Sequence, residues 1–282
     1  MRKLLSLFIL AFIFYCDSVA QLTNLINFNG TNGSNPCGNL ILSGKKLFGV
    51  TETGGAHDSG CIFSIDTNGS GYKDLFDFTL TKGAYPFGSL TLSGGLLYGM
   101  TIEGGASNYG CIYSIDTNGS GYVDLHDFNG INGKNPYGSL TISGGVMYGM
   151  TYAGGKSNRG CVFSINANGS GYTDLFDFGG QLWSDTGMNP YGSLLLSGST
   201  LYGMTYSGGI YLYGCIFSIQ TNGTGYKDLH DFWYTTGSYP YGSLILLGGK
   251  LFGMTNGGGT NDDGVVFSIN PFGIIYIFYN YL

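Results

Sequence analysis

Short apolar runs rich in Leu, Ile, Tyr, Phe and Thr recur along the chain, and glycine-rich segments separate them. Residues of these types favour β-strands, and glycine tolerates the positive φ angles of tight turns. The clearest stretch contains Ser-Gly-Gly, a loop with Gly-Gly and then Asn-Gly-Ser-Gly, which are typical turn sequences. Between these turns the pattern predicts four strands, at 89–93, 96–101, 111–115 and 122–128. The predicted fold class is all-β.

This four-strand unit, whose strands we name A to D, occurs five times. One proline of the unit recurs at intervals of 50, 50, 54 and 50 residues, at Pro36, Pro86, Pro136, Pro190 and Pro240. Four antiparallel strands per period of about 50 residues are typical of a β-propeller blade. We therefore expect a single propeller domain of five four-stranded blades over 21–282. Its repeats span about 36–85, 86–135, 136–189, 190–239 and 240–282.

The strands do not alternate cleanly between apolar and polar residues, which is typical of sheets covered on both faces. Neighbouring blades can supply that cover, whereas one blade alone cannot. Residues 22–28 resemble strand D, but 272–278, at the matching place in the last repeat, resemble it poorly. We expect the N-terminal strand to complete the fifth blade and close the ring, because closure removes exposed strand edges. A piece of a longer array is the alternative.

The whole repeat follows the pattern PYGSLxxSGGxLYGMTxxGGxxxxGCIFSIxxNGSGYxDLxDF. This pattern resembles the GloVer tandem-repeat family, found in exported bacterial proteins with varied surface anchors, and the resemblance covers residues 21–269. In that family the pieces resembling YGMT, GG, G-hydrophobic-F-S-I and L-x-x-F form the repeat signature. The resemblance implies a propeller-like surface protein of undetermined activity, and it supplies no catalytic residue.

The composition narrows the class of protein. Gly accounts for 52 of 282 residues, aromatic residues for 16% and charged residues for only 10%, with a formal net charge of −6. The aromatic and hydrophobic content excludes a disordered chain, and the negative charge disfavours nucleic acid as a partner.

The N-terminus resembles an export signal. Arg2 and Lys3 precede the apolar run 4–15, and small residues at 18–20 offer a cleavage site before Gln21. The protein is therefore expected to be secreted or displayed at the cell surface, with a lipoprotein signal at Cys16 as the alternative. No later apolar run has the length of a membrane helix, and we expect a monomer.

The differences among the repeats predict where a ligand binds. In an up-down-up-down blade the A–B and C–D turns lie on one face of the disc, and the B–C and D–A loops lie on the other. The A–B and C–D turns are nearly constant, whereas the B–C loops read AHDS, ASNY, KSNR, IYLY and TNDD. Diverse loops on a rigid frame are typical of binding surfaces, although drift in exposed loops is the alternative. Aromatic rings with few charges suit sugars or a protein partner. The candidate ligand-binding residues are Tyr109, Trp183, Tyr211, Tyr213, Trp233 and Tyr234.

The C–D turns resemble calcium loops, because oxygen-bearing side chains stand at positions 1, 3, 5 and 9 around a glycine at position 6. Each loop has only two carboxylates, and Asn166 and Gln220 begin the loops of the third and fourth repeats. A tight hairpin is the alternative reading, and no other cofactor is expected. Any calcium would bind weakly, at Asp66, Asn68, Ser70, Asp74, Asp116, Asn118, Ser120 and Asp124.

The other recurrent polar residues are interpreted as structural. The aspartates near the end of strand D are expected to accept N–H bonds from the following turn. The recurrent cysteines are expected to be buried rather than bridged, because equivalent positions of adjacent blades lie too far apart, although a Cys37–Cys61 pair stays open. Two histidines replace phenylalanine in strand D, which suggests strand packing. These residues are Asp77, Asp127, Asp177, Asp231, Cys61, Cys111, Cys161, Cys215, His126 and His230.

We thus expect an exported, non-enzymatic propeller that binds a glycan or a protein through the B–C and D–A loops. One alternative is a hydrolase or lyase acting on polysaccharide in the central channel. Glu52 and Glu103 are carboxylates that only two repeats carry, and their spacing does not identify a glycosidase site. A purely structural surface protein is the other alternative.

Overall fold

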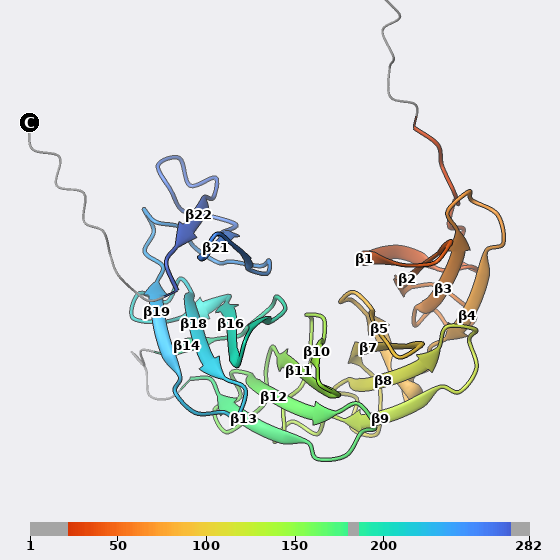
Figure 1. The fold of residues 1–282 in the computed structure, drawn as a ribbon, viewed down its shortest axis with the longest axis horizontal. Helices are drawn as coiled ribbons and strands as arrows, with labels where there is room; N and C mark the ends of the chain where they lie inside the picture. The colour runs from red at the N-terminus through yellow and green to blue at the C-terminus, as the bar shows by residue number, and fades with distance from the viewer. Residues whose placement is uncertain (1–21, 180–185, 272–282) are drawn as a thin grey trace, which may run out of the picture.

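The computed structural model describes residues 22–179 and 186–271. The predicted all-β class is confirmed, since apart from one short 3-10 helix, η1 (Leu80–Lys82), the regular structure in these residues consists of strands. Each repeat forms its own antiparallel sheet. Figure 1 shows that these sheets follow one another round an arc whose two ends do not meet.

The first three repeats show the order of strands A to D that the sequence predicts, and the second has one additional short strand. The first sheet contains β1 (Ser34–Ser43), β2 (Lys46–Thr53), β3 (Cys61–Asp66) and β4 (Lys73–Asp77). The second contains β5 (Ala84–Pro86), β6 (Thr91–Ser93), β7 (Leu96–Glu103), β8 (Cys111–Asp116) and β9 (Val123–Asp127). The third contains β10 (Thr141–Ser143), β11 (Val146–Thr151), β12 (Cys161–Asn166) and β13 (Thr173–Asp177).

The last two repeats depart slightly from this order. The fourth sheet contains β15 (Leu195–Ser197), β16 (Thr200–Thr205), β18 (Cys215–Gln220) and β19 (Lys227–Asp231). A short separate pair consists of β14 (Gly187–Met188) and β17 (Ser207–Gly208). The fifth sheet has three strands in the described part of the chain, β20 (Ile245–Leu247), β21 (Lys250–Met254) and β22 (Val266–Ile269).

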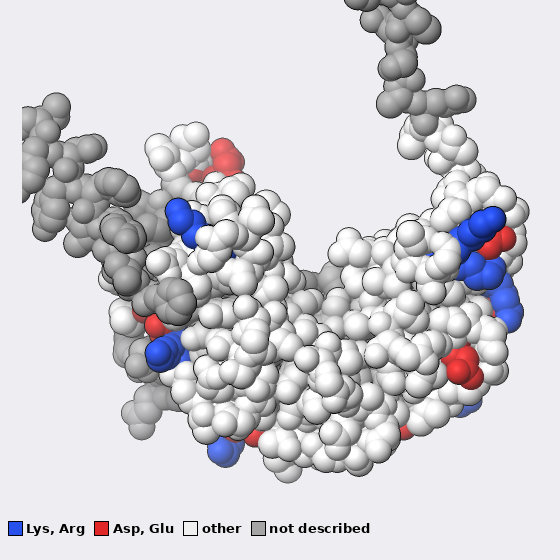
Figure 2. Space-filling view, viewed as in Figure 1, with Lys and Arg blue, Asp and Glu red and all other residues white. Residues whose placement is uncertain are grey.

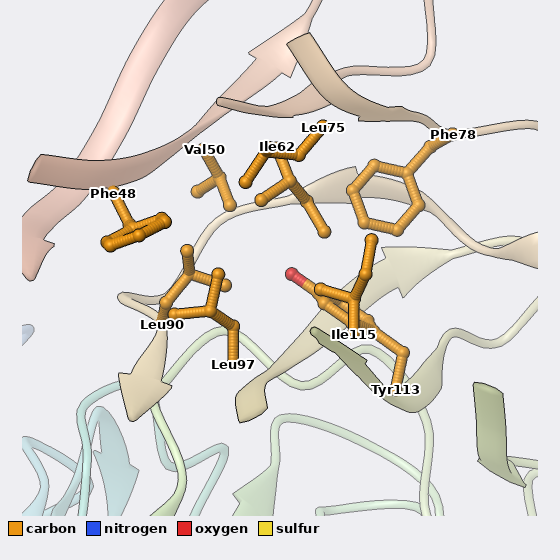
Figure 3. Packing of buried hydrophobic residues seen from close by; sticks show 9 residues of the cluster. All are labelled: Phe48, Val50, Ile62, Leu75, Phe78, Leu90, Leu97, Tyr113 and Ile115. Atoms are coloured by element: carbon orange, nitrogen blue, oxygen red, sulfur yellow. The ribbon is translucent and has the colours of Figure 1, made fainter. Parts of the chain in front are cut away.

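The hydrophobic core lies between adjacent sheets. Between the first two sheets, Phe48, Val50 and Ile62 of the first face Leu90 and Leu97 of the second, and all five are almost fully buried (Figure 3). The same arrangement recurs between each later pair of neighbouring sheets. Both faces of an internal sheet are therefore covered, which explains why its strands lack a clean apolar and polar alternation.

Hydrogen bonds also link neighbouring sheets near the start of strand A. The N–H of Ser89 donates to Oγ of Ser139 at 2.8 Å, and the N–H of Ser139 donates to Oγ of Ser193 at 2.8 Å. In the same way the N–H of Ser193 donates to Oγ of Ser243, and the N–H of Asn39 donates to Oγ of Ser89. Because Ser89 is bonded to the next sheet, the regular strand β6 begins only at Thr91, later than the sequence predicts.

The two ends of the arc expose apolar side chains that are covered at the same positions elsewhere. Leu40 of the first sheet is 53% exposed, whereas its equivalents in the later sheets, such as Leu90 at 2%, are buried. Met254 of the fifth sheet is 61% exposed, whereas Met100 and Met204 are 4% and 3% exposed. Between internal sheets these two kinds of surface pack against each other. Each end of the arc therefore exposes one half of such an interface.

The structure does not show the closed ring that we predicted. Residues 22–29 are not assigned to a strand, and no described sheet combines strands from both ends. The segment lies instead against the first sheet, where Phe28 contacts Phe63 with ring centroids 5.1 Å apart. The analogous contact inside the arc joins Phe78 of strand D to Tyr113 of the next sheet, also at 5.1 Å. The N-terminal segment therefore packs as strand D of a preceding sheet would, as its sequence predicts, but it does not pair with β22.

Candidate functional site

The B–C and D–A loops form one continuous face. The N–H of Gly55, in the first B–C loop, donates to the carbonyl of Gly30 at 2.8 Å, and Gly155 donates in the same way to Gly130 at 2.9 Å. On the opposite face the A–B and C–D turns meet, as in the bond from the N–H of Thr67 to the carbonyl of Lys45 at 2.8 Å. We call the B–C and D–A side the loop face.

An aspartate of strand D holds the tip of each of the first four B–C loops. Oδ1 of Asp77 accepts the N–H of Ala56 at 2.8 Å, and Oδ1 of Asp231 accepts the N–H of Ile210 at 3.0 Å. Asp127 and Asp177 make the equivalent bonds. The structural interpretation of these aspartates is therefore confirmed, but the expected partner was wrong. The bond is made to a loop 21 residues earlier and not to the turn that follows.

A second carboxyl group lies beside each of these aspartates. Burial, followed by the negative charge of Asp77, raises the pKa of Asp74 to about 6. Asp124 and Asp174 behave in the same way, and burial together with Asp231 raises the pKa of Asp228 to about 7. Each of these four carboxyl groups therefore takes up a proton at a higher pH than an exposed aspartate does.

Four of the six predicted ligand-binding residues lie together on the loop face of the fourth repeat. The ring centroids of Tyr211 and Trp233 are 4.6 Å apart, and Tyr213 lies 6.3 Å from both Trp233 and Tyr234. Tyr211 and Trp233 are 45% and 48% exposed. Hydrogen bonding to Asp262 raises the pKa of the exposed Tyr234.

The other two predicted residues do not join this cluster in the described part of the chain. Tyr109 lies beside the D–A loop of the second repeat, where Nζ of Lys134 stands 5.4 Å above its ring. A cation over the ring face competes with a ligand for that face. Trp183 lies outside the described residues.

A group of aromatic residues that the sequence analysis did not select lies at the inner end of the A strands. Tyr137 and Tyr191 stack with centroids 4.4 Å apart, and Phe87 contacts both, at 5.7 and 5.9 Å. Tyr241 lies 4.9 Å from Tyr191. The available signal was the residue after each repeat proline, which is Phe or Tyr in four repeats and Cys37 in the first. Side chains from the second, third, fourth and fifth repeats therefore meet close to the axis of the arc.

The phenol groups near the axis stay protonated at neutral pH. A hydrogen bond with Tyr241, followed by burial, raises the pKa of Tyr206 to about 12. Burial raises the pKa of Tyr191 to about 12, and it also raises the pKa of Tyr137, to which Glu103 and Glu52 contribute. These groups can donate as well as accept hydrogen bonds, beside carboxylates that accept them.

Only some of the predicted calcium ligands lie close to one another in the structure. Oγ of Ser70 lies 2.8 Å from Oδ1 of Asn68 and 3.5 Å from Oδ2 of Asp66, and Asp66 also forms an ion pair with Lys46. Asp74 is paired with Asp77 instead. In the second loop Oγ of Ser120 likewise lies 2.7 Å from Oδ1 of Asn118 and 3.0 Å from Oδ2 of Asp116, and Asp127 acts on Asp124. Within the described ranges no three His, Cys, Asp or Glu side chains form a metal-binding group. Calcium binding stays a prediction.

The recurrent cysteines and His126 are packed as interpreted. Cys61 is free and buried, and its N–H donates to Oγ1 of Thr51 at 3.2 Å, while Cys37 is free as well. Burial raises the pKa of the Cys61 thiol to about 11, which disfavours the reactive thiolate. His126 stacks on Tyr172 at 4.0 Å, as Phe76 stacks on Tyr122 in the repeat before.

Charge is sparse around the inside of the arc. Figure 2 shows Lys, Arg, Asp and Glu mainly toward its outer edge in this view. In the part of the chain that the structure covers, no helix is both long and apolar enough to cross a membrane.

Solved structures resemble the fold at low sequence identity. A chain of the nidogen/laminin complex matches with a TM-score of 0.53 and 15% identity, over 77% of this chain and 71% of that chain. A puromycin-hydrolysing peptidase of Mycobacterium tuberculosis matches with a TM-score of 0.52 and 12% identity, over 82% of this chain and 36% of that chain. A comparison with curated proteins finds no match. The structural likeness supports a propeller-like fold and carries no activity with it.

The repeat itself identifies the family. The sequence model of the Gloeobacter/Verrucomicrobia repeat matches residues 11–158 and 124–282, two overlapping stretches that together cover nearly the whole chain. This agrees with the recurring turns, strands and prolines described above. The chain therefore belongs to the Gloeobacter/Verrucomicrobia repeat family.

Proposed function

We propose that this protein is an exported or cell-surface, non-catalytic scaffold that binds carbohydrate through its loop face. The observation that carries the proposal is the cluster of Tyr211, Tyr213, Trp233 and Tyr234 on that face. Aromatic side chains offer broad apolar surfaces together with polar groups at their edges, which suits sugar rings. The export signal predicted over residues 1–20 supports contact with extracellular glycans.

The recurrent carboxyl groups favour a binding role over catalysis, because they hold loops in place. The recurrent aspartates of strand D hold the B–C loops through backbone N–H groups, as Asp77 does for Ala56. At the inner end of the A strands, the rings of Phe87, Tyr137 and Tyr191 pack against one another. This arrangement supports a packed scaffold with its ligand on the surface.

We also propose that the arc closes into a five-bladed ring in solution. The fifth sheet has no fourth strand among the described residues, and the segment that contains Phe28 already packs as a strand D. Pairing of that segment with β22 would complete the sheet and cover Met254 and Leu40. Burying such apolar surface contributes about 25 cal/mol per Å², which favours the closed form.

A glycan array probed with the mature full-length chain tests the carbohydrate proposal. Wild type is expected to bind a subset of glycans, and Tyr211→Ala or Trp233→Ala is expected to weaken that binding by about tenfold, the effect of losing a central aromatic contact. Undiminished binding by both variants would exclude the loop face. Retention of a protein with no glycan bound would favour a protein partner, and release of reducing ends or unsaturated products would favour the polysaccharide-degrading alternative.

A further inference from the structure

The aromatic cluster on the loop face continues without a break to the axis. From Tyr213 the ring contacts run to Tyr239 at 5.6 Å, from Tyr239 to Tyr206 at 5.1 Å and from Tyr206 to Tyr241 at 4.9 Å. From Tyr241 they reach the axial residue Tyr191 at 4.9 Å. We call this set the aromatic row; it contains Tyr211, Trp233, Tyr213, Tyr239, Tyr206, Tyr241 and Tyr191.

The fourth B–C loop, which carries Tyr211 and Tyr213 of the row, contains a residue in an unfavourable backbone conformation. Each of the five loops has one residue with φ between 52° and 67°, and in four of them this residue is Asp or Asn. Oδ1 of Asn108, for example, accepts the N–H of Gly104 at 3.0 Å. In the fourth loop the position is taken by Leu212, with φ of 67°, whose side chain cannot accept such a bond. Leucine tolerates this conformation worse than Asn does.

A second residue with positive φ lies in the row itself. The residue before each repeat proline has φ between 51° and 58°, and it is Asn in three repeats. In the fifth repeat it is Tyr239, which bridges the outer and inner parts of the row. The second repeat has Tyr85 at the same position, away from the row.

The chemistry of the row fits a polymer of neutral sugars. It is elongated, so several units of a chain can contact it at once, whereas the central residues of a protein interface cluster compactly. Six of its seven members are tyrosines, which combine an apolar ring with a hydroxyl group. A carboxylate acts near each end of the row, since Asp262 hydrogen-bonds to Tyr234 beside the outer end and Glu52 acts on Tyr191 at the inner end. Such negative charge repels sulfated or uronic acid chains.

We propose that a neutral polysaccharide chain lies along the aromatic row, from Trp233 at the outer loops to Tyr191 at the axis. This inference rests on the proposed carbohydrate binding and makes it specific in ligand class, direction and residues.

Titration calorimetry with neutral β-glucan oligosaccharides, from disaccharide to hexasaccharide, tests the row. Affinity is expected to rise with each added unit, and sulfated oligosaccharides of equal length are expected to bind at least about tenfold more weakly. Trp233→Ala and Tyr241→Ala each lower the affinity for the hexasaccharide, by about tenfold. Tyr109→Ala, which removes a ring outside the row, leaves the affinity unchanged.

Substitutions at the residues with positive φ distinguish effects on binding from effects on stability. Leu212→Asn is expected to raise the melting temperature by about 2–4 °C. Tyr239→Asn relieves the same strain but removes the ring contacts with Tyr206 and Tyr213, and it is expected to weaken hexasaccharide binding. Tyr85→Asn is the matched control, because it relieves the same backbone strain outside the row. It should raise the melting temperature and leave binding unchanged.

The outcomes distinguish the row from the broader proposal. If neutral oligosaccharides bind but only Tyr109→Ala lowers their affinity, binding along the aromatic row is wrong. Carbohydrate binding by the loop face would still stand. If affinity does not depend on chain length, or sulfated chains bind more tightly, the row is wrong as well. If no oligosaccharide of either class binds, the carbohydrate proposal itself fails and the row fails with it.

Discussion

Two carboxyl groups face each other near the end of strand D in each of the first four repeats. The pKa of Asp228 is raised to about 7, and the pKa values of Asp74, Asp124 and Asp174 are raised to about 6, by burial first and then by the neighbouring aspartate. An unfolded aspartate has a pKa of about 3.9, so the folded protein holds these protons more tightly. The stability that the pairs contribute is complete below about pH 4 and is lost as the pH rises through 6 to 7. Burial lowers the pKa of His126 and of His230, which opposes this trend in acid.

Asp228→Asn separates the effect of the carboxyl pair on stability from that of the histidines, because an amide resembles the protonated carboxyl group at every pH. The variant is expected to melt at least about 2–4 °C above wild type at pH 8, the shift that a gain of about 1 kcal/mol produces. Below about pH 4 the two proteins should melt together. Thermal unfolding followed by circular dichroism across this range measures the difference. A variant that is less stable than wild type at pH 8 would contradict the assignment.

The sequence predicted the burial or packing of some single residues but not the contacts of others. The burial of Cys61 and the packing of His126 followed from their recurrence at strand positions, and both were confirmed. The partner of Asp77 could not be predicted, because it depends on how a B–C loop folds back over strand D. Tyr191 was missed because an aromatic residue beside a repeat proline reads as a packing residue until several such residues are seen to meet near the axis.

At the scale of the element, strands B and C matched their predicted positions closely because their pairing places Gly opposite an aromatic residue. Gly149 pairs with Phe163, and a Cβ built on Gly149 would lie 2.5 Å from the ring. The same pair recurs as Gly49 with Phe63. This register explains why the motif YGM and the motif FSI repeat together. Strand A was predicted less well, since hydrogen bonds to the next sheet replace part of its ladder.

At the scale of the whole molecule, the sequence predicted repeated sheets with covered faces, but ring closure depends on contacts between the two ends. Glycines at the inner end of strand A report on such contacts. A Cβ on Gly192 would lie 2.0 Å from the carbonyl oxygen of Gly242 in the next sheet, whereas a Cβ on Gly242 meets nothing within 4 Å in the open arc.

Gly192→Ala and Gly242→Ala together therefore test the proposed closure. Gly192→Ala should destabilise the protein by about 1–3 kcal/mol, the usual effect of overpacking. In a closed ring Gly242→Ala meets the first sheet and should cost about the same, as measured by urea unfolding. A Gly242→Ala protein as stable as wild type would show that the ends stay apart.

The central claim, that a neutral glycan lies on the aromatic row, can be tested with one fluorescence titration. The sequence has two tryptophans, Trp183 and Trp233, so a Trp183→Phe variant emits from Trp233 alone. Trp233 is half exposed and its ring lies 4.6 Å from that of Tyr211. A neutral β-glucan hexasaccharide is expected to change this emission saturably, with the affinity that calorimetry gives for the same variant. Calorimetric binding of the hexasaccharide with no change in Trp233 emission would contradict the claim.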